Sequence, residues 1–197
     1  MFLTMVGAAM AKTVRSSRND ELVVRARTDA KALGELYEMY YERVFRFCVH
    51  RLFSKEIAED ITSTVFLEVA RRMRGFAGRT ERDFRSWLYT IAVNQVNAYI
   101  RKSSRRRRLL SKAAESIAAS SAHPDGSRRF DWPRLYAALM KLRPEHQTII
   151  TLRFFENLHY DEIARIMGMQ QSTARVRLHR VLQKLRKQLQ KSFEEQA

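Results

Sequence analysis

The sequence has little cysteine, proline or glycine, with one, three and six of these residues among 197. The lone cysteine, Cys48, excludes an internal disulfide framework and a zinc site built on several cysteines, and we interpret it as a small buried apolar residue. No apolar run approaches the about 18 residues that a membrane-spanning helix needs. Paired catalytic carboxylates, a phosphate-binding glycine loop and clusters of metal ligands are also missing. The sequence therefore predicts no enzyme, no small-molecule substrate, no cofactor and no metal.

Acidic residues are the minority among the charged ones, with 21 Asp and Glu against 37 Lys and Arg, for a formal net charge of +16. Such an excess favours a polyanionic partner, either nucleic acid or an anionic membrane face. The length suits one or two small domains, and the 45% hydrophobic content suits a chain with ordinary folded cores.

The N-terminal stretch MFLTMVGAAMAK resembles a secretion signal only slightly, because no Lys or Arg precedes its short apolar part. We therefore expect a cytoplasmic protein in which residues 1–23 form a disordered lead-in. Met1, Met5 and Met10 remain alternative starts.

Apolar residues recur at helical spacing, and no alternating strand pattern is sustained, which predicts an all-α fold. Within residues 24–104, one helix follows Asp29 and a second follows Ser54, because both are good N-cap residues. A glycine-containing loop leads to a third helix, which begins near Phe84 and ends in basic residues near Arg101. Together these helices are expected to form one small domain.

The composition changes abruptly in residues 105–130, which are rich in Arg, Ser and Ala. We interpret them as a flexible basic linker that leaves the domains on either side without a fixed spacing. The run Arg105–Arg108 would be stabilised by a polyanion that neutralises its four like charges.

Residues 131–190 are expected to form a second helical domain, followed by a tail at 191–197. Pro144 suits the first turn of a helix. The segment DEIARIMGMQQSTARVRLHR has two helices separated by Gly168-Met169-Gln170, a turn of the length that a helix-turn-helix uses. Because Gln170 and Gln171 are weak caps, Ser172 or Thr173 is an alternative start of the last helix.

A helical wheel of this last helix separates two faces. The apolar stripe consists of Ala174, Leu178, Val181 and Leu185. The opposite face consists of Arg175, Val176, His179, Arg180 and Gln183. In a helix-turn-helix the second helix enters the major groove, where Arg can bind guanine and Val can contact a thymine methyl group. A solvated basic face is the alternative, but the turn length and the charge confined to one face favour DNA binding.

Three segments in order resemble the bacterial sigma-70 family of RNA polymerase sigma factors, extracytoplasmic-function group. AEDITSTVFLEVARRM (58–73) resembles the helix that binds core polymerase, and FRSWLYTIAVNQVNAYIRK (84–102) the helix that melts the promoter. LRPEHQTIITLRFFENLHYDEIARIMGMQQSTARVRLHR (142–180) resembles the domain that reads the −35 element. The resemblance implies a sigma factor with domain 2 at 24–104 and domain 4 at 131–190, and it implies as partners the polymerase clamp and flap, promoter DNA and an anti-sigma factor.

The same resemblance implies roles for individual residues. Contact with the polymerase clamp falls to Asp60, Val65, Phe66 and Val69. Binding of −10 DNA falls to Asn94, Arg79, Arg82, Arg101 and Lys102. Reading of −35 bases falls to Arg175, Val176, His179 and Arg180. The remaining −35 contacts, chiefly with phosphates, fall to Arg153, Tyr160, Ser172, Thr173, Arg177 and Lys184.

Some of these residues have simpler alternatives. Phe66 could pack in the core, and Asp60 could be no more than a solvated residue on the surface of its helix. Asn94 could serve local capping or packing. Ser63 and Ala98 also depart from the Gln and Asp that the family often has at these positions.

Other functions remain as alternatives to a sigma factor. A stand-alone helix-turn-helix regulator shares the C-terminal domain but gives no reason for the motifs at 58–73 and 84–102. A basic protein of the membrane surface should bind liposomes better than promoters. Copurification with core polymerase separates the sigma factor from the regulator.

Overall fold

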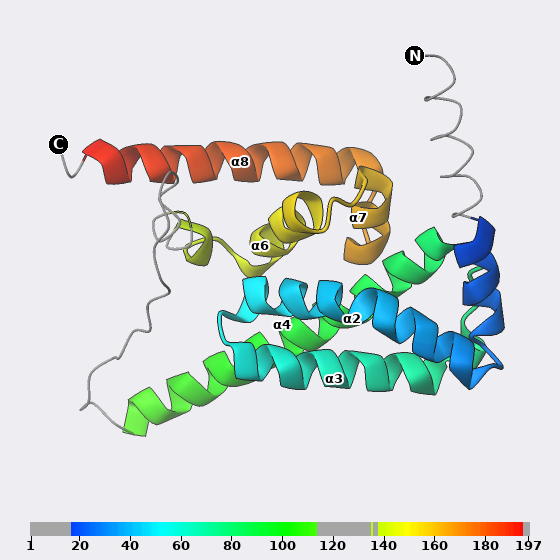
Figure 1. Ribbon diagram of the computed structural model, residues 1–197. Coiled ribbons are helices and arrows are strands. Elements are labelled where there is room, and N and C mark those ends of the chain that lie inside the picture. The colour runs from blue at the N-terminus through cyan, green and yellow to red at the C-terminus, as the bar shows by residue number, and fades with distance from the viewer. Residues whose placement is uncertain (1–16, 114–134, 136–137, 195–197) are drawn as a thin grey trace, which may run out of the picture.

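The computed structural model describes residues 17–113, 135 and 138–194, with the backbone alone at 105–113 and 191–194. All regular elements within these ranges are helical (Figure 1), which confirms the predicted all-α fold. The predictions for the three alternative starts, for the linker beyond Ala113 and for the last three residues lie outside the described residues. The side chains of Arg105–Arg108 lie outside them as well.

Three helices make the first block: α2 (Ala30–Leu52), α3 (Lys55–Arg72) and α4 (Glu81–Ala113). A short 3-10 turn, η1 (Met73–Gly75), follows α3. Both predicted N-caps are confirmed, since the Asp29 carboxylate accepts the Lys31 N–H at 2.9 Å and the Ser54 hydroxyl accepts the Ile57 N–H at 3.4 Å. These caps satisfy amide groups that have no partner inside the helix, and so they fix where α2 and α3 begin.

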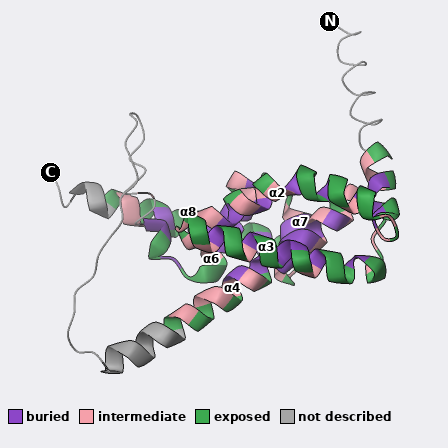
Figure 2. Cartoon of the chain, turned by 60° about the horizontal axis from the view of Figure 1, so that its bottom comes forward, coloured by how far each residue is buried: buried purple, intermediate pink, exposed green. Residues whose placement is uncertain are grey.

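Aromatic side chains dominate the core that α2, α3 and α4 share. Tyr40, Phe47, Phe84 and Tyr89 are each 0% exposed, and Phe47 and Tyr89 meet edge to face at 5.6 Å. Cys48 is buried among them, as predicted, and burial raises the pKa of its thiol to about 11. In Figure 2 the buried residues, in purple, lie mainly along the parts of the helices that face other helices. This core holds α4 in place.

The predicted lead-in is too long, because residues 17–25 are helical and pack on the first block. Leu22 and Val23 are buried in the core. Asp20 accepts the backbone N–H of Glu81 at 2.6 Å, at the start of α4, and Asn19 donates to the Glu81 carboxylate at 2.9 Å. The apolar pair and these hydrogen bonds tie the segment to α4.

Helix α4 is longer than predicted. It was expected to end near Arg101, whereas it runs to Ala113, for 33 residues in all. In Figure 1 its C-terminal part extends away from the other helices. Arg and Lys are good helix formers, so the backbone stays helical after the apolar spacing has ended.

The second block contains α6 (Pro144–Ile150), a π-helical turn η2 (Thr151–Phe155), α7 (Tyr160–Met167) and α8 (Gln171–Glu194). Pro144 lies in the first turn of α6, as predicted. Gly168 ends α7 with φ of +63°, a left-handed conformation that favours glycine. Helix α8 begins at Gln171 with no shift to Ser172 or Thr173, and the Ala174 N–H donates to the Gln170 carbonyl at 3.0 Å. The helix-turn-helix is therefore present with the predicted turn.

The two blocks pack against each other through α4 and α7. Arg85 donates from Nε and Nη2 to Glu162 Oε1, at 2.8 and 2.5 Å. Arg82 pairs with Asp161 at 2.5 Å, and Arg165 pairs with Asp83 at 3.1 Å. The expectation that the domains have no fixed spacing therefore fails for this structure, because complementary charges hold them together.

A buried carboxylate extends this contact. Glu156, at the end of η2, is only 6% exposed and accepts a hydrogen bond from the Tyr89 hydroxyl of α4. Arg43 of α2 lies 3.8 Å from the same carboxylate. The ring of His50 packs on Phe155 with centroids 4.0 Å apart. Burial raises the pKa of Glu156 and lowers that of His50, since each is held where its charged form is poorly solvated.

Candidate nucleic-acid interface

Helix α8 presents the two faces that its sequence predicted. Ala174, Leu178, Val181 and Leu185 are buried against the rest of the second block. The opposite, exposed face carries Arg175, Val176, His179, Arg180 and Gln183. Val176 is an apolar side chain that is 48% exposed, and it lies between basic neighbours. A helix that follows the turn of a helix-turn-helix with such a face has the form of a DNA-recognition helix.

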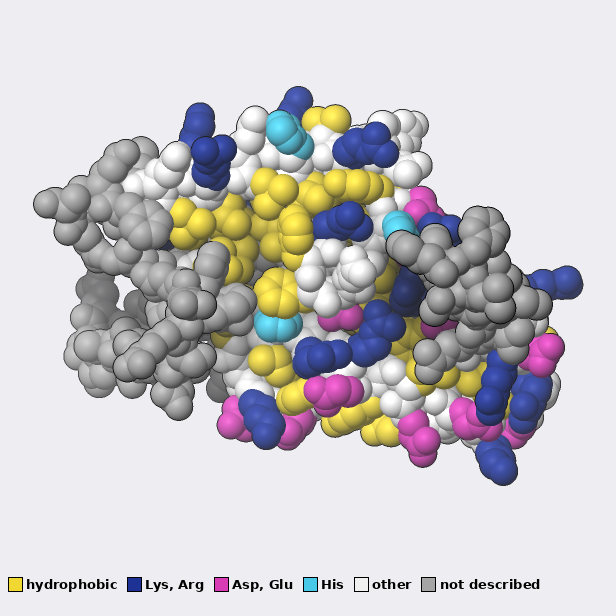
Figure 3. All heavy atoms as spheres, turned by 45° about the horizontal axis from the view of Figure 1, so that its top comes forward, with side chains coloured by type: hydrophobic (Ala, Val, Ile, Leu, Met, Phe, Trp, Pro, Cys, Tyr) yellow, Lys and Arg dark blue, Asp and Glu magenta, His cyan; other side chains and the backbone are white. Residues whose placement is uncertain are grey.

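In the space-filling view of Figure 3, Lys, Arg and His side chains stand over α8 along the upper edge, whereas most acidic side chains lie below. Along this edge the basic side chains stand without acidic neighbours, whereas elsewhere in the view both signs are mixed, and a stretch of basic side chains alone suits contact with DNA phosphates.

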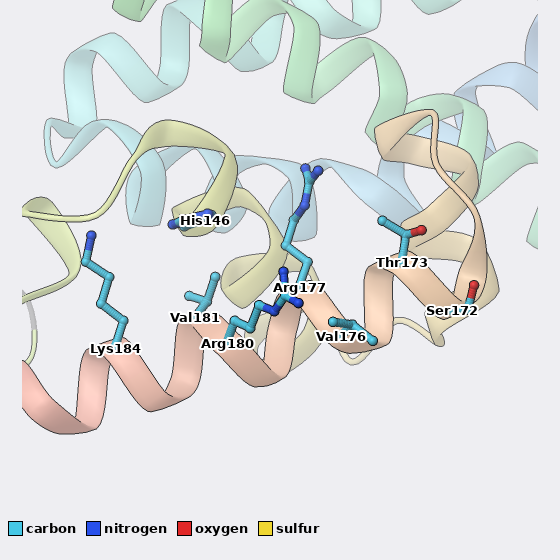
Figure 4. A pocket seen from close by; sticks show the side chains of 8 residues that line it. All are labelled: His146, Ser172, Thr173, Val176, Arg177, Arg180, Val181 and Lys184. Carbon is cyan, nitrogen blue, oxygen red and sulfur yellow. The ribbon is translucent and has the colours of Figure 1, made fainter.

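A shallow hollow lies beside this face, and its residues come from α8 and α6 (Figure 4). It is lined by Ser172, Thr173, Val176, Arg177, Arg180, Lys184, His146 and Val181. Six of these eight were predicted to contact the −35 element, so the structure brings them together around one concave surface. Hydroxyl and basic side chains around a shallow hollow suit a phosphate backbone.

Arg177 differs from the other arginines of α8. It is partly exposed, and its Nη1 lies 3.7 Å from the Glu145 carboxylate of α6. Arg175 and Arg180 are exposed on the outer face. The division of these arginines into two that read bases and one on the flank that holds phosphate stays a prediction.

His146 is a member of the hollow that the sequence did not indicate. It lies across from α8 on α6, and its Nδ1 is buried without a hydrogen-bond partner in the structure. Burial, together with the nearby cations Lys184, Arg143 and Arg177, lowers its pKa. Only the fold brings His146 close to Lys184, so no local pattern could have indicated it.

Tyr160 and Arg153 do not line this hollow but form a group of their own with Arg175. The Arg153 guanidinium lies 5.0 Å from the Tyr160 ring centroid, and that of Arg175 lies 5.4 Å from it. Arg153 also donates from Nη1 to the Leu158 carbonyl at 2.9 Å. A protein carbonyl thus already uses one of the donors of Arg153, for which a phosphate contact was predicted.

The predicted −10 residues fall into two groups. Asn94, Arg101 and Lys102 are exposed on α4, at a spacing that places them on one side of the helix. Because Asn94 is exposed, it does not pack in the core. Arg79 is exposed in the loop before α4, and Arg82 is joined to Asp161 of α7. Arg82 lies 12 residues before Asn94, or roughly 18 Å along a helix, so the structure does not bring these two groups together.

The predicted polymerase-binding residues also divide. Asp60 is exposed on α3, whereas Val65, Phe66 and Val69 are buried at 0%, 8% and 1% exposure. The Phe66 ring lies 4.8 Å from that of Tyr37 and 6.1 Å from that of Tyr41, both on α2. The prediction is corrected for these three apolar residues, which form the packed side of α3. They support the helix that presents Asp60.

Two protein-family models match this chain. The model of Sigma-70 region 2 matches residues 36–106, and that of Sigma-70, region 4 matches residues 138–187. Together these matches cover more than half of the chain. The chain belongs to the sigma-70 family of RNA polymerase sigma factors. The first match contains α3 and most of α2, and the second contains the helix-turn-helix.

Curated relatives place the chain in the extracytoplasmic-function (ECF) group of that family. It is 35% identical over 175 residues to the ECF RNA polymerase sigma factor BldN of Streptomyces coelicolor, over 86% of this chain and 65% of that one. It is 31% identical over 168 residues to the RNA polymerase sigma factor YlaC of Bacillus subtilis, over 84% of this chain and 96% of that one. The chain thus spans slightly less than two thirds of the first relative and nearly all of the second.

Solved structures support the fold. The sigma factor RpoE of Bartonella quintana, in complex with the anti-sigma factor NepR, has a TM-score of 0.65 and 21% identity, over 81% of this chain and 98% of that one. CnrH in complex with the cytosolic domain of CnrY also has a TM-score of 0.65, with 17% identity over 87% of this chain and 97% of that one. In the part of this sigma factor that the structure describes, none of the helices has the length and apolar content to cross a membrane.

Proposed function

We propose that this chain binds core RNA polymerase and directs it to promoters whose −35 and −10 elements it reads, without catalysing a reaction itself. The observation that carries the proposal is the pairing of a region-4 helix-turn-helix, with its recognition face exposed, and a region-2 helix α4 with exposed Asn94, Arg101 and Lys102. One DNA-reading domain would suffice for a simple regulator. Two, in a chain that belongs to the sigma-70 family, support promoter recognition by a polymerase subunit.

The polymerase contact is proposed on the exposed side of α3. Asp60 lies there beside Ser63, Thr64 and Leu67, and Leu67 is an apolar side chain 51% exposed. An exposed carboxylate next to an apolar side chain suits a protein interface with a basic partner surface. The clamp of the core enzyme is the proposed partner of this side, and the flap is that of the second block.

A regulator that withholds the protein from polymerase is part of the proposal. One solved structure of the same fold contains the anti-sigma factor NepR, and another contains the cytosolic domain of CnrY. We propose a partner of this kind for the present chain, which would act in the cytoplasm together with polymerase.

Transcription by core polymerase with and without the purified protein tests the function, with the 5′ ends of the products sequenced. We expect a set of new start sites that share one −10 and one −35 sequence. Specific promoter binding by the protein alone, with no new start sites, would instead support a stand-alone regulator.

Charge reversal tests the proposed polymerase contact. Asp60→Arg should weaken copurification with core enzyme, because it replaces an attraction by a repulsion. Glu59→Arg, the same change at the adjacent exposed residue of α3, is the matched control and should have the smaller effect. Equal copurification of Asp60→Arg and the unmodified protein would remove Asp60 from the interface.

A further inference from the structure

Tyr160 joins the loop before the helix-turn-helix to the recognition helix. It is the first residue of α7, and its ring has a guanidinium near it from each of two other elements. Arg153 Cζ of η2 lies 5.0 Å from the ring centroid, and Arg175 Cζ of α8 lies 5.4 Å from it. Both distances are within the about 6 Å over which a cation is attracted to an aromatic face.

One side of this group is fixed by hydrogen bonds. Arg153 donates from Nη1 to the Leu158 carbonyl at 2.9 Å, which holds its guanidinium beside the loop. The first turn of α7 is closed by the His159 N–H, which donates to Glu162 Oε2 at 3.2 Å, and by the Ile163 N–H, which donates to the His159 carbonyl at 3.0 Å. The helix turn that carries Tyr160 is therefore held by hydrogen bonds, and its ring packs against the core, so the exposed Arg175 is the member of the group that the ring can restrain.

Arginine can stack and bind a base at the same time. A stacked guanidinium uses its planar face, whereas its N–H groups point outward in the plane and stay available for a bidentate contact. A free arginine on a helix surface has many rotamers to lose when it binds. Attraction to the Tyr160 ring restricts the rotamers of Arg175 before DNA arrives, so less freedom is lost on binding.

We propose that Tyr160 is a positioning residue for base recognition, which acts by holding Arg175 toward the −35 element. This inference rests on the proposed function and replaces the phosphate contact that the family resemblance implies for Tyr160. The aromatic face, and not the hydroxyl, carries the effect. Arg153 is the second cation near the same ring.

The test measures transcription by the full chain with core polymerase on a promoter library randomised in the −35 element. Tyr160→Phe keeps the ring and removes only the hydroxyl, so base preferences should match those of the unmodified protein. Tyr160→Leu removes the ring and should reduce, by about two- to fivefold, the preference at the base pair that Arg175 reads. In an Arg175→Ala background, Tyr160→Leu should cause no further change in preference.

Each other outcome overturns the inference. A uniform loss across all sequences in Tyr160→Phe would show that the hydroxyl binds phosphate. Unchanged preferences in Tyr160→Leu would show that the ring does not position Arg175. The proposed base reading fails separately, if Arg175→Ala itself leaves preferences intact.

Thermal unfolding of each variant controls for loss of structure. If Tyr160→Leu lowers the melting temperature, Tyr160→Trp decides, because Trp retains an aromatic face and binds cations best. Preference at or above that of the unmodified protein supports the inference. A loss of preference in Tyr160→Trp as large as that in Tyr160→Leu overturns it.

Discussion

Three arginines within two turns of α8 have different surroundings. Arg175 Cζ lies over the Tyr160 ring at 5.4 Å, Arg180 is exposed on the outer face, and Arg177 lies near the Glu145 carboxylate at 3.7 Å. An arginine whose donors are free can form the bidentate contact that recognises guanine. One on the flank of the helix is better placed to hold a phosphate, which every sequence offers.

We therefore expect Arg175→Ala and Arg180→Ala each to cost about 1–3 kcal/mol on the preferred promoter and to relax preference at one base pair. Arg177→Ala should weaken binding to all promoter sequences alike, and it should lower the slope of log affinity against log salt concentration by about one. Transcription from a −35 library at several salt concentrations measures both effects. The same uniform loss in all three variants would mean that the helix is only an electrostatic anchor.

Glu156 makes the stability of the folded protein depend on pH, in a direction that follows from its shifted pKa. Burial raises the pKa of Glu156. At a pH between the ordinary and the raised value, the folded state therefore holds a proton that the unfolded state has released. Its contribution to stability is therefore greatest below the ordinary glutamate pKa and falls as pH rises through the raised value.

Glu156→Gln removes this titration while keeping an acceptor for the Tyr89 hydroxyl. The free energy of unfolding of the unmodified protein minus that of the variant should decrease as pH rises from about 4.5, the ordinary pKa, toward neutrality. Urea unfolding at a series of pH values gives this difference, from which the titration of His50 and His146 cancels. A difference that does not change with pH would contradict the assignment.

The helices differ in how much of their faces and their ends could be predicted from the sequence. The face of α8 was predictable because apolar residues repeat every three or four positions and only one helical orientation buries them. The same rule assigns Val65, Phe66 and Val69 to the core, so motif resemblance misled where periodicity was correct. The end of α4 could not be predicted, because its apolar spacing stops well before its helical backbone ends.

Two glycines lie in different backbone conformations, and substitution of each tests the conformation of its element. Gly168 has φ of +63°, whereas Gly34 lies in the interior of α2 with no atom within 4 Å of the position a Cβ would take. Gly168→Ala should lower the free energy of unfolding by about 1–2 kcal/mol, since a Cβ disfavours the left-handed conformation. Gly34→Ala should raise it by about 0.5–1 kcal/mol, since Ala favours helix. Denaturant unfolding of both variants measures the two shifts, and the same sign for both would contradict the assignment.

At the scale of the whole molecule, the contact between the blocks is the feature that the sequence did not indicate. Arg85 and Glu162 are 77 positions apart, and no local periodicity relates them. The basic linker predicted independent domains, whereas complementary charges on α4 and α7 join them. Each block was recognisable alone, because periodic patterns report which face a helix buries and not which charged residue it meets.

Arg85→Ala should loosen this contact. Glu162 is 0% exposed on its side chain, and loss of Arg85 leaves it without its closest cation. We expect a larger radius of gyration by small-angle X-ray scattering, and a smaller response to added salt than in the unmodified protein. Arg71→Ala, which breaks an exposed pair with Glu68 inside α3, is the control and should leave the radius unchanged. An unchanged radius in Arg85→Ala would show that other contacts hold the blocks together.

Glu162 has one further consequence, which follows from its two oxygens. One accepts the N–H of His159 and closes the first turn of α7, while the other binds Arg85 of α4. Docking of the blocks and order in that turn are therefore thermodynamically linked, and linkage is reciprocal. A ligand that binds more tightly when the turn is rearranged must favour separation of the blocks by the same free energy.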